Sequence, residues 1–232
     1  MRFATPLVRA RLIERYKRFL SDHELESGEI VTAHCANPGG MIGLKQPGME
    51  TWLMPASNPN RKLAWDWQLA KADGGLVGIH TGHPNGLVAE AIAARQIPEV
   101  AGYAGLRREV KYGVNSRIDI LLEDPNRPPC YLEIKNCHLR RGELAEFPDA
   151  VTARGAKHMG ELAAMAEAGN RAIVMYVVQR MDCPAFALAD DIDPGYAAAL
   201  KDAIGRGVEA LAYSCRLNTD EIVLDKAMPL HV

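Results

Sequence analysis

A β-hairpin signal in residues 116–136, SRIDILLEDPNRPPCYLEIKN, constrains the fold of this chain more than any other feature. Residues 117–122 form a β-prone run, and the acidic, proline-rich segment 123–129 follows it. Because proline has no amide hydrogen to donate to a neighbouring strand, we expect the chain to leave the sheet there. Residues 130–135 then alternate as a second strand would. The sequence thus predicts two strands joined by a turn over 123–129.

The second strand presents charged side chains on one of its faces. Glu133 and Lys135 are two residues apart and share a face, whereas Leu132 and Ile134 lie on the other face. If the two strands pair across the turn, Asp119 lies opposite Glu133. We therefore expect the hairpin to bring an aspartate, a glutamate and a lysine together.

Two carboxylates and an amine on rigid strands suit metal-assisted cleavage of phosphodiester bonds. Mg²⁺ prefers oxygen ligands and often takes one or two carboxylates with several waters, so Asp119 and Glu133 are candidate catalytic ligands of Mg²⁺ or Mn²⁺. Lys135 is then the candidate catalytic residue that orients or deprotonates a water, or offsets charge on the phosphate. The alternative is a solvated cross-strand ion pair worth well under about 1 kcal/mol.

Composition limits the possible functions. The 232 residues are 48% hydrophobic with a formal net charge of -2, so a sizeable core is expected and any affinity for nucleic acid must come from a local patch. The five cysteines show no Cys-x-x-Cys spacing, which argues against a zinc knuckle or a disulfide framework and predicts a reduced, cytoplasmic protein. With no signal-peptide pattern and no long apolar run, no membrane partner is expected.

Residues 1–80 show the pattern of short strands between turns. Turn-forming runs at 37–40 (NPGG) and 46–48 (QPG) separate β-prone segments. Frequent turns between short strands favour a small β-barrel or a β-sandwich. We expect two domains, residues 1–80 and residues 81–232, in a chain of the α/β (α+β) class.

The beginning of the chain is rich in cations. Six basic residues fall within residues 1–18, and Tyr16 and Phe19 lie among or next to them. Cations combined with stacking aromatics suit contact with nucleic acid. A solvated basic edge strand with buried aromatics explains the same pattern. The candidate nucleic-acid contacts in this region are Arg9, Arg11, Arg15, Lys17 and Arg18.

The remainder of the chain places helices and further strands around the hairpin. A helix before the hairpin contains Glu90, which is either a solvated side chain or an outer ligand of the metal. An uninterrupted apolar run at 171–178 is typical of a central strand covered on both faces. The predicted elements are a helix at 84–97, a strand at 106–113, the hairpin, a helix at 147–168, a strand at 171–178, a helix at 194–205, and strands at 209–217 and 221–224.

The order from 84 to 178 is helix, three strands, helix, strand, which is the order of the restriction-endonuclease-like core. Asp119 followed by Glu133-Ile134-Lys135 resembles the Asp and Glu-x-Lys of the PD-(D/E)xK nuclease superfamily, although Ile118 stands where that motif has proline. The resemblance implies that basic side chains around the hairpin and on the second helix contact substrate phosphates. These candidates are Arg107, Lys111, Arg117, Arg154, Lys157 and His158.

A closer resemblance covers nearly the whole chain. Five blocks are similar to the sugar fermentation stimulation protein family: LIERYKRFL (12–20), HCANPGGM (34–41), EVKYG (109–113), SRID (116–119) and FPDAVTARGAKH (147–158). The resemblance implies an N-terminal OB-like β-barrel and a C-terminal restriction-endonuclease-like domain with a mixed sheet flanked by helices. It also implies DNA binding without marked sequence preference and a regulatory link to the use of sugars, maltose in particular.

The sequence leaves competing functions open. The first is a DNA-binding protein that retains an Mg²⁺-dependent phosphodiesterase site, and the second is a DNA-binding regulator of sugar utilisation that performs no hydrolysis. A sugar-binding protein is disfavoured, because aromatic platforms for a sugar are not evident beyond Trp65 and Trp67. DNA is the expected partner, and a homodimer is left open.

Overall fold

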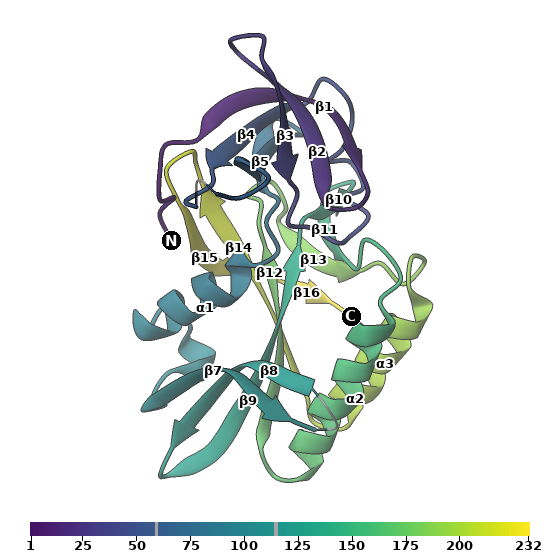
Figure 1. Cartoon of the computed structure of the whole chain (residues 1–232). Helices are drawn as coiled ribbons and strands as arrows, with labels where there is room; N and C mark the ends of the chain where they lie inside the picture. The colour runs from purple at the N-terminus through teal and green to yellow at the C-terminus, as the bar shows by residue number, and fades with distance from the viewer. Residues whose placement is uncertain (59, 114–115) are drawn as a thin grey trace.

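The computed structural model describes residues 1–58, 60–113 and 116–232, and it shows a β-barrel stacked on a mixed sheet with three α-helices (Figure 1). The barrel is built from the N-terminal strands, and the helices surround the sheet at the other end of the molecule. No helix within these described ranges has the length and apolar character needed to cross a membrane.

The barrel is five-stranded and closed. Its strands run in the order β3-β2-β1-β4-β5, and a parallel pairing of β3 with β5 joins the two ends. Along β1 the small or apolar Ala10 and Leu12 point into the core while Arg9 and Arg11 are exposed, as alternation requires. This strand order confirms the expected OB-like barrel. The strands are β1 (Val8–Tyr16), β2 (Leu20–Leu25), β3 (Ile30–His34), β4 (Glu50–Pro55) and β5 (Trp65–Ala72), with β6 (Gly75–Gly78) added beside β5.

The mixed sheet has the order β15-β14-β12-β9-β8-β7. β7, β8 and β9 form an antiparallel meander, and β12 lies parallel to β9 and to β14. This arrangement confirms the restriction-endonuclease-like core. The strands are β7 (Gly105–Tyr112), β8 (Ser116–Asp124), β9 (Arg127–Cys137), β12 (Arg171–Val178), β14 (Glu209–Leu217) and β15 (Ile222–Ala227).

Helices cover both faces of this sheet. α1 (His83–Ala93) packs on one face, and α2 (Ala153–Glu167) with α3 (Pro194–Gly205) packs on the other (Figure 1). β12 is buried along almost its whole length, which confirms the prediction from its apolar run. A short 3₁₀ helix at Pro98–Val100 leads from α1 towards β7.

Two expectations need correction. The helix predicted at 147–168 begins only at Ala153, because Thr152 accepts a hydrogen bond from the amide of Gly155 at 3.1 Å and caps it, while Phe147 ends a strand. The turn of the hairpin is also shorter than 123–129, since β9 already starts at Arg127. Its prolines are tolerated because they lie beside a register shift and before β9 pairs with β12.

A second, four-stranded sheet was not predicted. Its order is β10-β11-β13-β16, and its strands are only two to four residues long. They are β10 (Leu139–Arg141), β11 (Leu144–Phe147), β13 (Ala185–Leu188) and β16 (Leu230–His231). Strands this short leave no readable alternation, and their partners are far away in the sequence.

The barrel and the mixed sheet are joined through buried polar contacts. The guanidinium of Arg180, which is 2% exposed, donates to Asp73 of the barrel at 2.8 Å and to Asp182 at 2.6 and 2.7 Å. Gln179 donates to the backbone carbonyl of His80 at 3.1 Å. At Gly78 a Cβ atom would lie 2.5 Å from the Gln179 side chain, so the contact requires glycine. These contacts hold the barrel against the end of β12.

Candidate metal and nucleic-acid site

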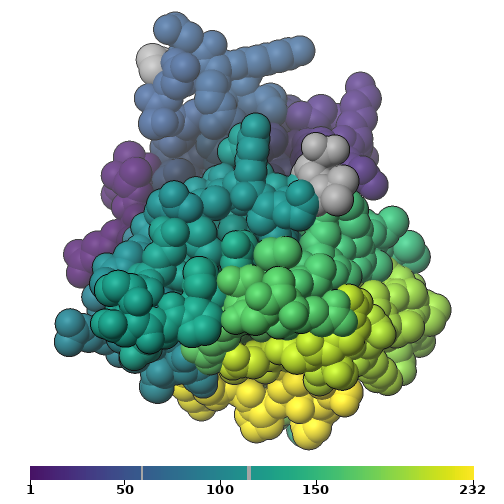
Figure 2. Space-filling model, turned by 90° about the horizontal axis from the view of Figure 1, so that it is seen from below, coloured from purple at the N-terminus to yellow at the C-terminus, as the bar shows by residue number. Residues whose placement is uncertain are grey.

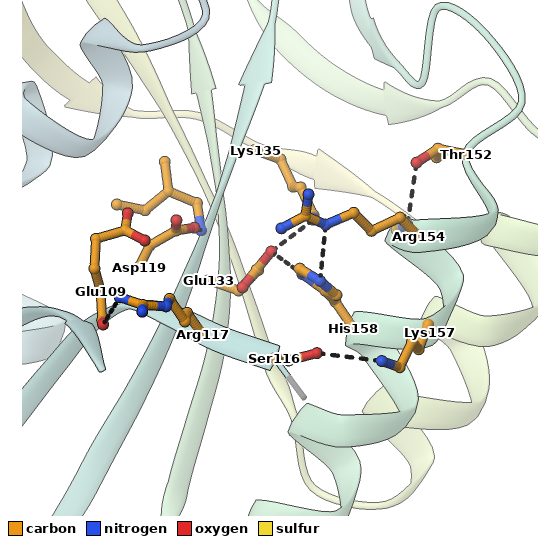
Figure 3. Close-up of a pocket in the computed structure, with 12 residues that line it drawn as sticks. Glu109, Ser116, Arg117, Asp119, Glu133, Lys135, Thr152, Arg154, Lys157 and His158 are labelled. Carbon is orange, nitrogen blue, oxygen red and sulfur yellow. Dashed lines mark hydrogen bonds and ion pairs between the residues drawn. The ribbon is translucent and has the colours of Figure 1, made fainter. Parts of the chain in front are cut away.

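A cleft of about 630 Å³ opens where β8 and β9 separate, facing the N-terminal half of α2 (Figure 3). It brings together all three residues of the predicted catalytic set with three cations and a histidine of the predicted phosphate contacts. From below, the strands of the meander and α2 form the near face of the molecule, with the barrel behind them (Figure 2). The charged and polar lining residues are Glu109, Ser116, Arg117, Asp119, Glu133, Lys135, Thr152, Arg154, Lys157 and His158.

Asp119 is fixed at the point where the hairpin opens. The pairing of Ile120 with Leu132 places Asp119 beside Glu133, and there the Asp119 Oδ2 accepts a hydrogen bond from the backbone amide of Ile134 at 2.7 Å. Its Oδ1 accepts a second one from Asn85 Nδ2 of α1 at 2.8 Å. Burial, followed by the negative charge of Glu133, raises the pKa of Asp119 to about 6 despite these two donors.

Glu133 lies deeper, at 3% exposed. Its Oε1 accepts hydrogen bonds from Lys135 Nζ at 2.8 Å and from His158 Nδ1 at 2.5 Å (Figure 3). Burial alone would raise the pKa of Glu133, but the hydrogen bonds from His158 and Lys135 outweigh it and hold this pKa below its ordinary value. Its Oε2 is buried and has no hydrogen-bond partner among the described residues. An ionised carboxylate with a spare buried oxygen therefore borders the cleft.

His158 contacts the carboxylate of Glu133 in the wall of the cleft. Arg154 Nε donates to His158 Nε2 at 3.3 Å, which assigns the ring proton to Nδ1, the atom that faces Glu133. The residue is 5% exposed, and both ring nitrogens are engaged within the protein. The contact of His158 with a phosphate stays a prediction, and in the structure the ring lines the cleft and hydrogen-bonds the carboxylate of Glu133.

The donor set of this cleft fits a hard divalent cation. Asp119 and Glu133 supply carboxylate oxygens from neighbouring strands, and the Oε2 of Glu133 is an orphaned acceptor of the kind that a cation satisfies. Across the part of the chain that the structure describes, no group of three or more histidine, cysteine, aspartate or glutamate residues is arranged as a metal site. The two carboxylates therefore form a small donor set, which leaves most of the shell of a bound cation to water.

Glu90 does not belong to this donor set. Its side chain is 60% exposed, it pairs with the ammonium group of Met1 at 2.7 Å, and it is absent from the cleft lining. The expectation of an outer metal ligand is corrected, because α1 turns Glu90 away from the hairpin.

Two polar residues that surround Asp119, Glu109 and Asn85, were not among the predicted site residues. Glu109 of β7 lines the cleft with a φ of 55°, a left-handed conformation that costs energy for a residue other than glycine. The amide of Asn85 reaches both Asp119 at 2.8 Å and the Glu109 carboxylate at 3.5 Å. No local pattern marked either residue, since Asn85 lies 34 positions before Asp119.

Cations surround the cleft unevenly. Arg117, Arg154 and Lys157 line it, whereas Lys111 lines an adjoining hollow of about 370 Å³ that also includes Arg117. Arg107 pairs with Glu123 at 3.0 Å and is not a lining residue. The predicted phosphate contacts closest to the carboxylates are therefore Arg117, Arg154 and Lys157.

The predicted contacts in the barrel do not form one patch. Arg9 pairs with Glu50 and Glu26, and Arg11 donates to the carbonyl of Gly48 at 3.3 Å. Arg15 is half-buried and binds backbone carbonyls, so its role is structural. The exposed Lys17 and Arg18 form the β1–β2 turn, with φ values of 46° and 67°. Of the five predicted contacts in the barrel, Lys17 and Arg18 are therefore the better placed to meet a polyanion.

Comparison with known proteins gives consistent matches along the chain. A family model described as the SfsA N-terminal OB domain matches residues 13–79, and one described as the sugar fermentation stimulation protein RE domain matches residues 82–221. The sugar fermentation stimulation protein homolog of Paramagnetospirillum magneticum is 61% identical over 224 residues, with 97% of this chain and 95% of the relative covered. That of Rhodospirillum centenum is 58% identical over 231 residues, with 99% of each covered.

A solved structure of SfsA from Pyrococcus furiosus, determined in complex with Ca²⁺, superposes with a TM-score of 0.91. It is 26% identical in sequence, and the match covers 100% of this chain and 98% of that one. Sequence matches over both domains and this whole-chain superposition agree. The chain therefore belongs to the sugar fermentation stimulation protein family.

Proposed function

We propose that this protein binds DNA with little sequence preference and hydrolyses phosphodiester bonds in the cleft between β8, β9 and α2. The observation that carries the proposal is the unpartnered, buried Oε2 of an ionised Glu133 beside Asp119, because such an oxygen calls for a cation. Two findings support it: the match to a restriction-endonuclease-like domain and the Ca²⁺ complex of the Pyrococcus furiosus relative.

Each side chain of the cleft has its own role in the proposed hydrolysis. Asp119 and Glu133 would hold Mg²⁺ or Mn²⁺, which supplies a Lewis acid for the phosphate and lowers the pKa of water. Lys135, whose Nζ lies 2.8 Å from Glu133, orients the attacking water or offsets the charge that develops on the phosphate. Arg117, Arg154 and Lys157 hold the flanking phosphates and fix register without reading bases.

A cleavage assay tests this proposal. Purified protein is incubated with single-stranded and double-stranded DNA in Mg²⁺, in Mn²⁺ and with a chelator. We expect cutting that the chelator stops and that Glu133→Gln or Lys135→Ala lowers at least about a hundredfold, since each removes a charge from the reacting centre. Glu167→Gln is the matched control, because Glu167 pairs with Arg206 at the far end of α2.

The second candidate is a DNA-binding regulator of sugar utilisation that does not cut. The observation that favours it is the limited donor set, two carboxylates without a third ligand grouped around one point in the described chain. In that case no DNA is cut under any condition, yet binding still weakens steeply as salt rises, because phosphate contacts dominate. A flat salt dependence would contradict both candidates.

A further inference from the structure

A second hollow, about 510 Å³ in volume, lies between the barrel and the nuclease-like domain. Thr152 and Arg154, at the start of α2, line both this hollow and the cleft of the carboxylates, so the two adjoin there. Arg18 of the barrel lines the hollow as well. Together the two adjoining hollows reach from the β1–β2 turn of the barrel, past the N-terminus of α2, to Asp119 and Glu133, and we call this path the groove.

Hydrogen bonds hold the barrel end of this groove. One guanidinium nitrogen of Arg15 donates to the carbonyls of Arg18 and Asn37, each at 2.8 Å, and of Gly39 at 3.1 Å. These bonds tie the β1–β2 turn to the loop that follows β3, and the amide of Cys35 donates to the carbonyl of Phe19 at 2.9 Å. The turn is therefore held in place by buried and half-buried partners and not by its exposed side chains.

An exposed aromatic surface lies on this turn. Phe19 is 44% exposed although it is large and apolar, and its ring stacks on that of His34 with centroids 6.4 Å apart and planes 28° from parallel. Phe19 follows Arg18 in the chain, and of the two only Arg18 lines the hollow, so the ring lies at or beyond its barrel end. An exposed ring next to a cation is the pattern that stacks an unpaired base while holding its phosphate. A base inside a duplex has no free face for such a ring.

The charges along the groove favour a polyanion. Arg18 stands at one end and Arg154 at the other. The carboxylate between them, Asp149, is already used: its Oδ2 accepts from the amide of Met41 at 2.8 Å and faces His138 Nε2 at 3.1 Å. Its Oδ2 is thus engaged by one contact from the barrel and one from its own domain.

We propose that an unpaired strand of DNA runs along this groove, stacking a base on Phe19 and delivering its backbone past Arg154 to the carboxylate cleft. This inference rests on the proposed function and narrows its substrate to DNA with a single-stranded segment, such as a flap or an overhang. The hollow has room for such a segment, because a volume of about 510 Å³ lies in the range of pockets that hold a small-molecule-sized group, roughly one or two nucleotides.

Binding measurements with matched variants test the path. Fluorescence anisotropy follows a labelled single strand, a duplex of the same sequence and a duplex with a flap, all with a chelator present so that no strand is cut. Phe19→Ala is expected to lower the affinity for the single strand and the flap about tenfold, and that for the duplex less than about twofold. Arg18→Asn, which suits the left-handed backbone of that position, should act in the same direction.

The control is Ile30→Ala. Ile30 is 67% exposed and lies on the same β2–β3 ladder, but at the opposite end from Leu20 and His34. It should bind all three DNAs as the unaltered protein does, and Phe19→Trp should keep the affinity because it retains a stacking ring. Thermal melting of each variant separates a loss of contact from a loss of fold.

The outcomes distinguish this inference from the proposed function. Equal losses on single strand and duplex, or no loss in Phe19→Ala, would overturn the path even if the protein cuts DNA. Phe19-dependent binding of the single strand by a protein that cuts nothing would support the path and overturn the hydrolysis. Cutting of a flap that is as fast in Phe19→Ala as in Ile30→Ala would also contradict the path.

Discussion

Asp119 and Glu133 lie on neighbouring strands of one hairpin, are both largely buried, and yet have pKa values shifted in opposite directions. For Asp119, burial and the charge of Glu133 dominate, and its partners are a neutral amide and a backbone N–H, so its pKa rises to about 6. For Glu133, a lysine and a histidine donor outweigh a similar burial, so its pKa falls. Burial raises the pKa of both carboxyl groups, and the hydrogen-bonding and charged partners determine whether the net shift is upward or downward.

The comparison explains why the pair suits a cation. The hydrogen bonds from Lys135 and His158 keep Glu133 ionised. The charge of Asp119 is destabilised by burial and by Glu133, and a bound divalent ion would remove this destabilisation. The raised pKa of Asp119 means that its charge is destabilised in the folded protein. Acids with perturbed pKa values cluster at functional sites. This difference predicts that substitutions around Glu133 and substitutions around Asp119 have different effects on stability, metal affinity and pKa.

The largest expected effect is on stability, from Lys135→Met. This change leaves Glu133 buried with its charge but without the ammonium group at 2.8 Å, and breaking one side of a buried pair costs about 3 kcal/mol. Asp119→Asn, in contrast, removes a like charge and should change stability by less than about 1 kcal/mol or raise it. Urea unfolding at neutral pH in chelator measures both. Equal losses of unfolding free energy in Lys135→Met and Asp119→Asn would contradict the difference between the two acids.

A smaller effect is expected from His158→Ala on metal affinity. The ring donates from Nδ1 to Glu133 and holds the carboxylate in position, and loss of such a supporting partner typically weakens metal binding about tenfold. Titration calorimetry with Mn²⁺ measures it, with the exposed His231→Ala as control. His158→Gln, which keeps a donor, should recover part of the loss. Unchanged Mn²⁺ affinity in His158→Ala would show that His158 does not position Glu133 for the metal.

The next prediction concerns the pKa of Asp119 itself. In Glu133→Gln the like charge is gone, so this pKa should fall below about 6, yet burial should keep it above the ordinary 3.8. NMR of ¹³C-labelled aspartate in metal-free protein follows the titration. A value that stays near 6 would mean that burial acts alone.

The same shift affects stability in a defined direction. Since the folded state binds this proton more tightly than the unfolded state, the stabilisation from it is complete below about pH 3.8 and is lost as the pH rises through about 6. Glu133→Gln should flatten that part of the stability curve. Unfolding at a series of pH values, again without metal, shows whether the slope between pH 4 and 6 decreases.

Much of the fold followed from local patterns. The apolar run at 171–178 became a buried central strand, the helix predicted at 194–205 has the bounds of α3, and the alternation around Glu133 put that residue and Lys135 on the cleft. In each case the pattern that predicted the feature lies within one short segment of the sequence. The spacing of turns in residues 1–80 left a barrel and a sandwich open, and the resemblance to the family decided for the barrel that the structure shows.

The remaining features depend on contacts between distant segments. The bond from Asn85 to Asp119, the left-handed backbone of Glu109 and the use of both His158 nitrogens are set by tertiary packing, which no window of sequence contains. The sequence showed a cation-rich start but could not show that Arg9 is paired and Arg15 is half-buried. Charge patterns predict where cations are and not which partners they find.

The smallest effect is expected from Glu90→Gln. Asn85 and Glu90 lie on the same helix five positions apart, and at about 100° per residue their side chains point roughly 140° away from each other. Because Asn85 donates to Asp119, Glu90 must face elsewhere, and it pairs with the ammonium of Met1 at 60% exposure, a contact worth less than about 0.5 kcal/mol. Calorimetry with Mn²⁺ should therefore give the affinity of the unaltered protein. A tenfold loss of Mn²⁺ affinity in Glu90→Gln would contradict this placement and would make Glu90 a third carboxylate that acts on the metal, beside Asp119 and Glu133.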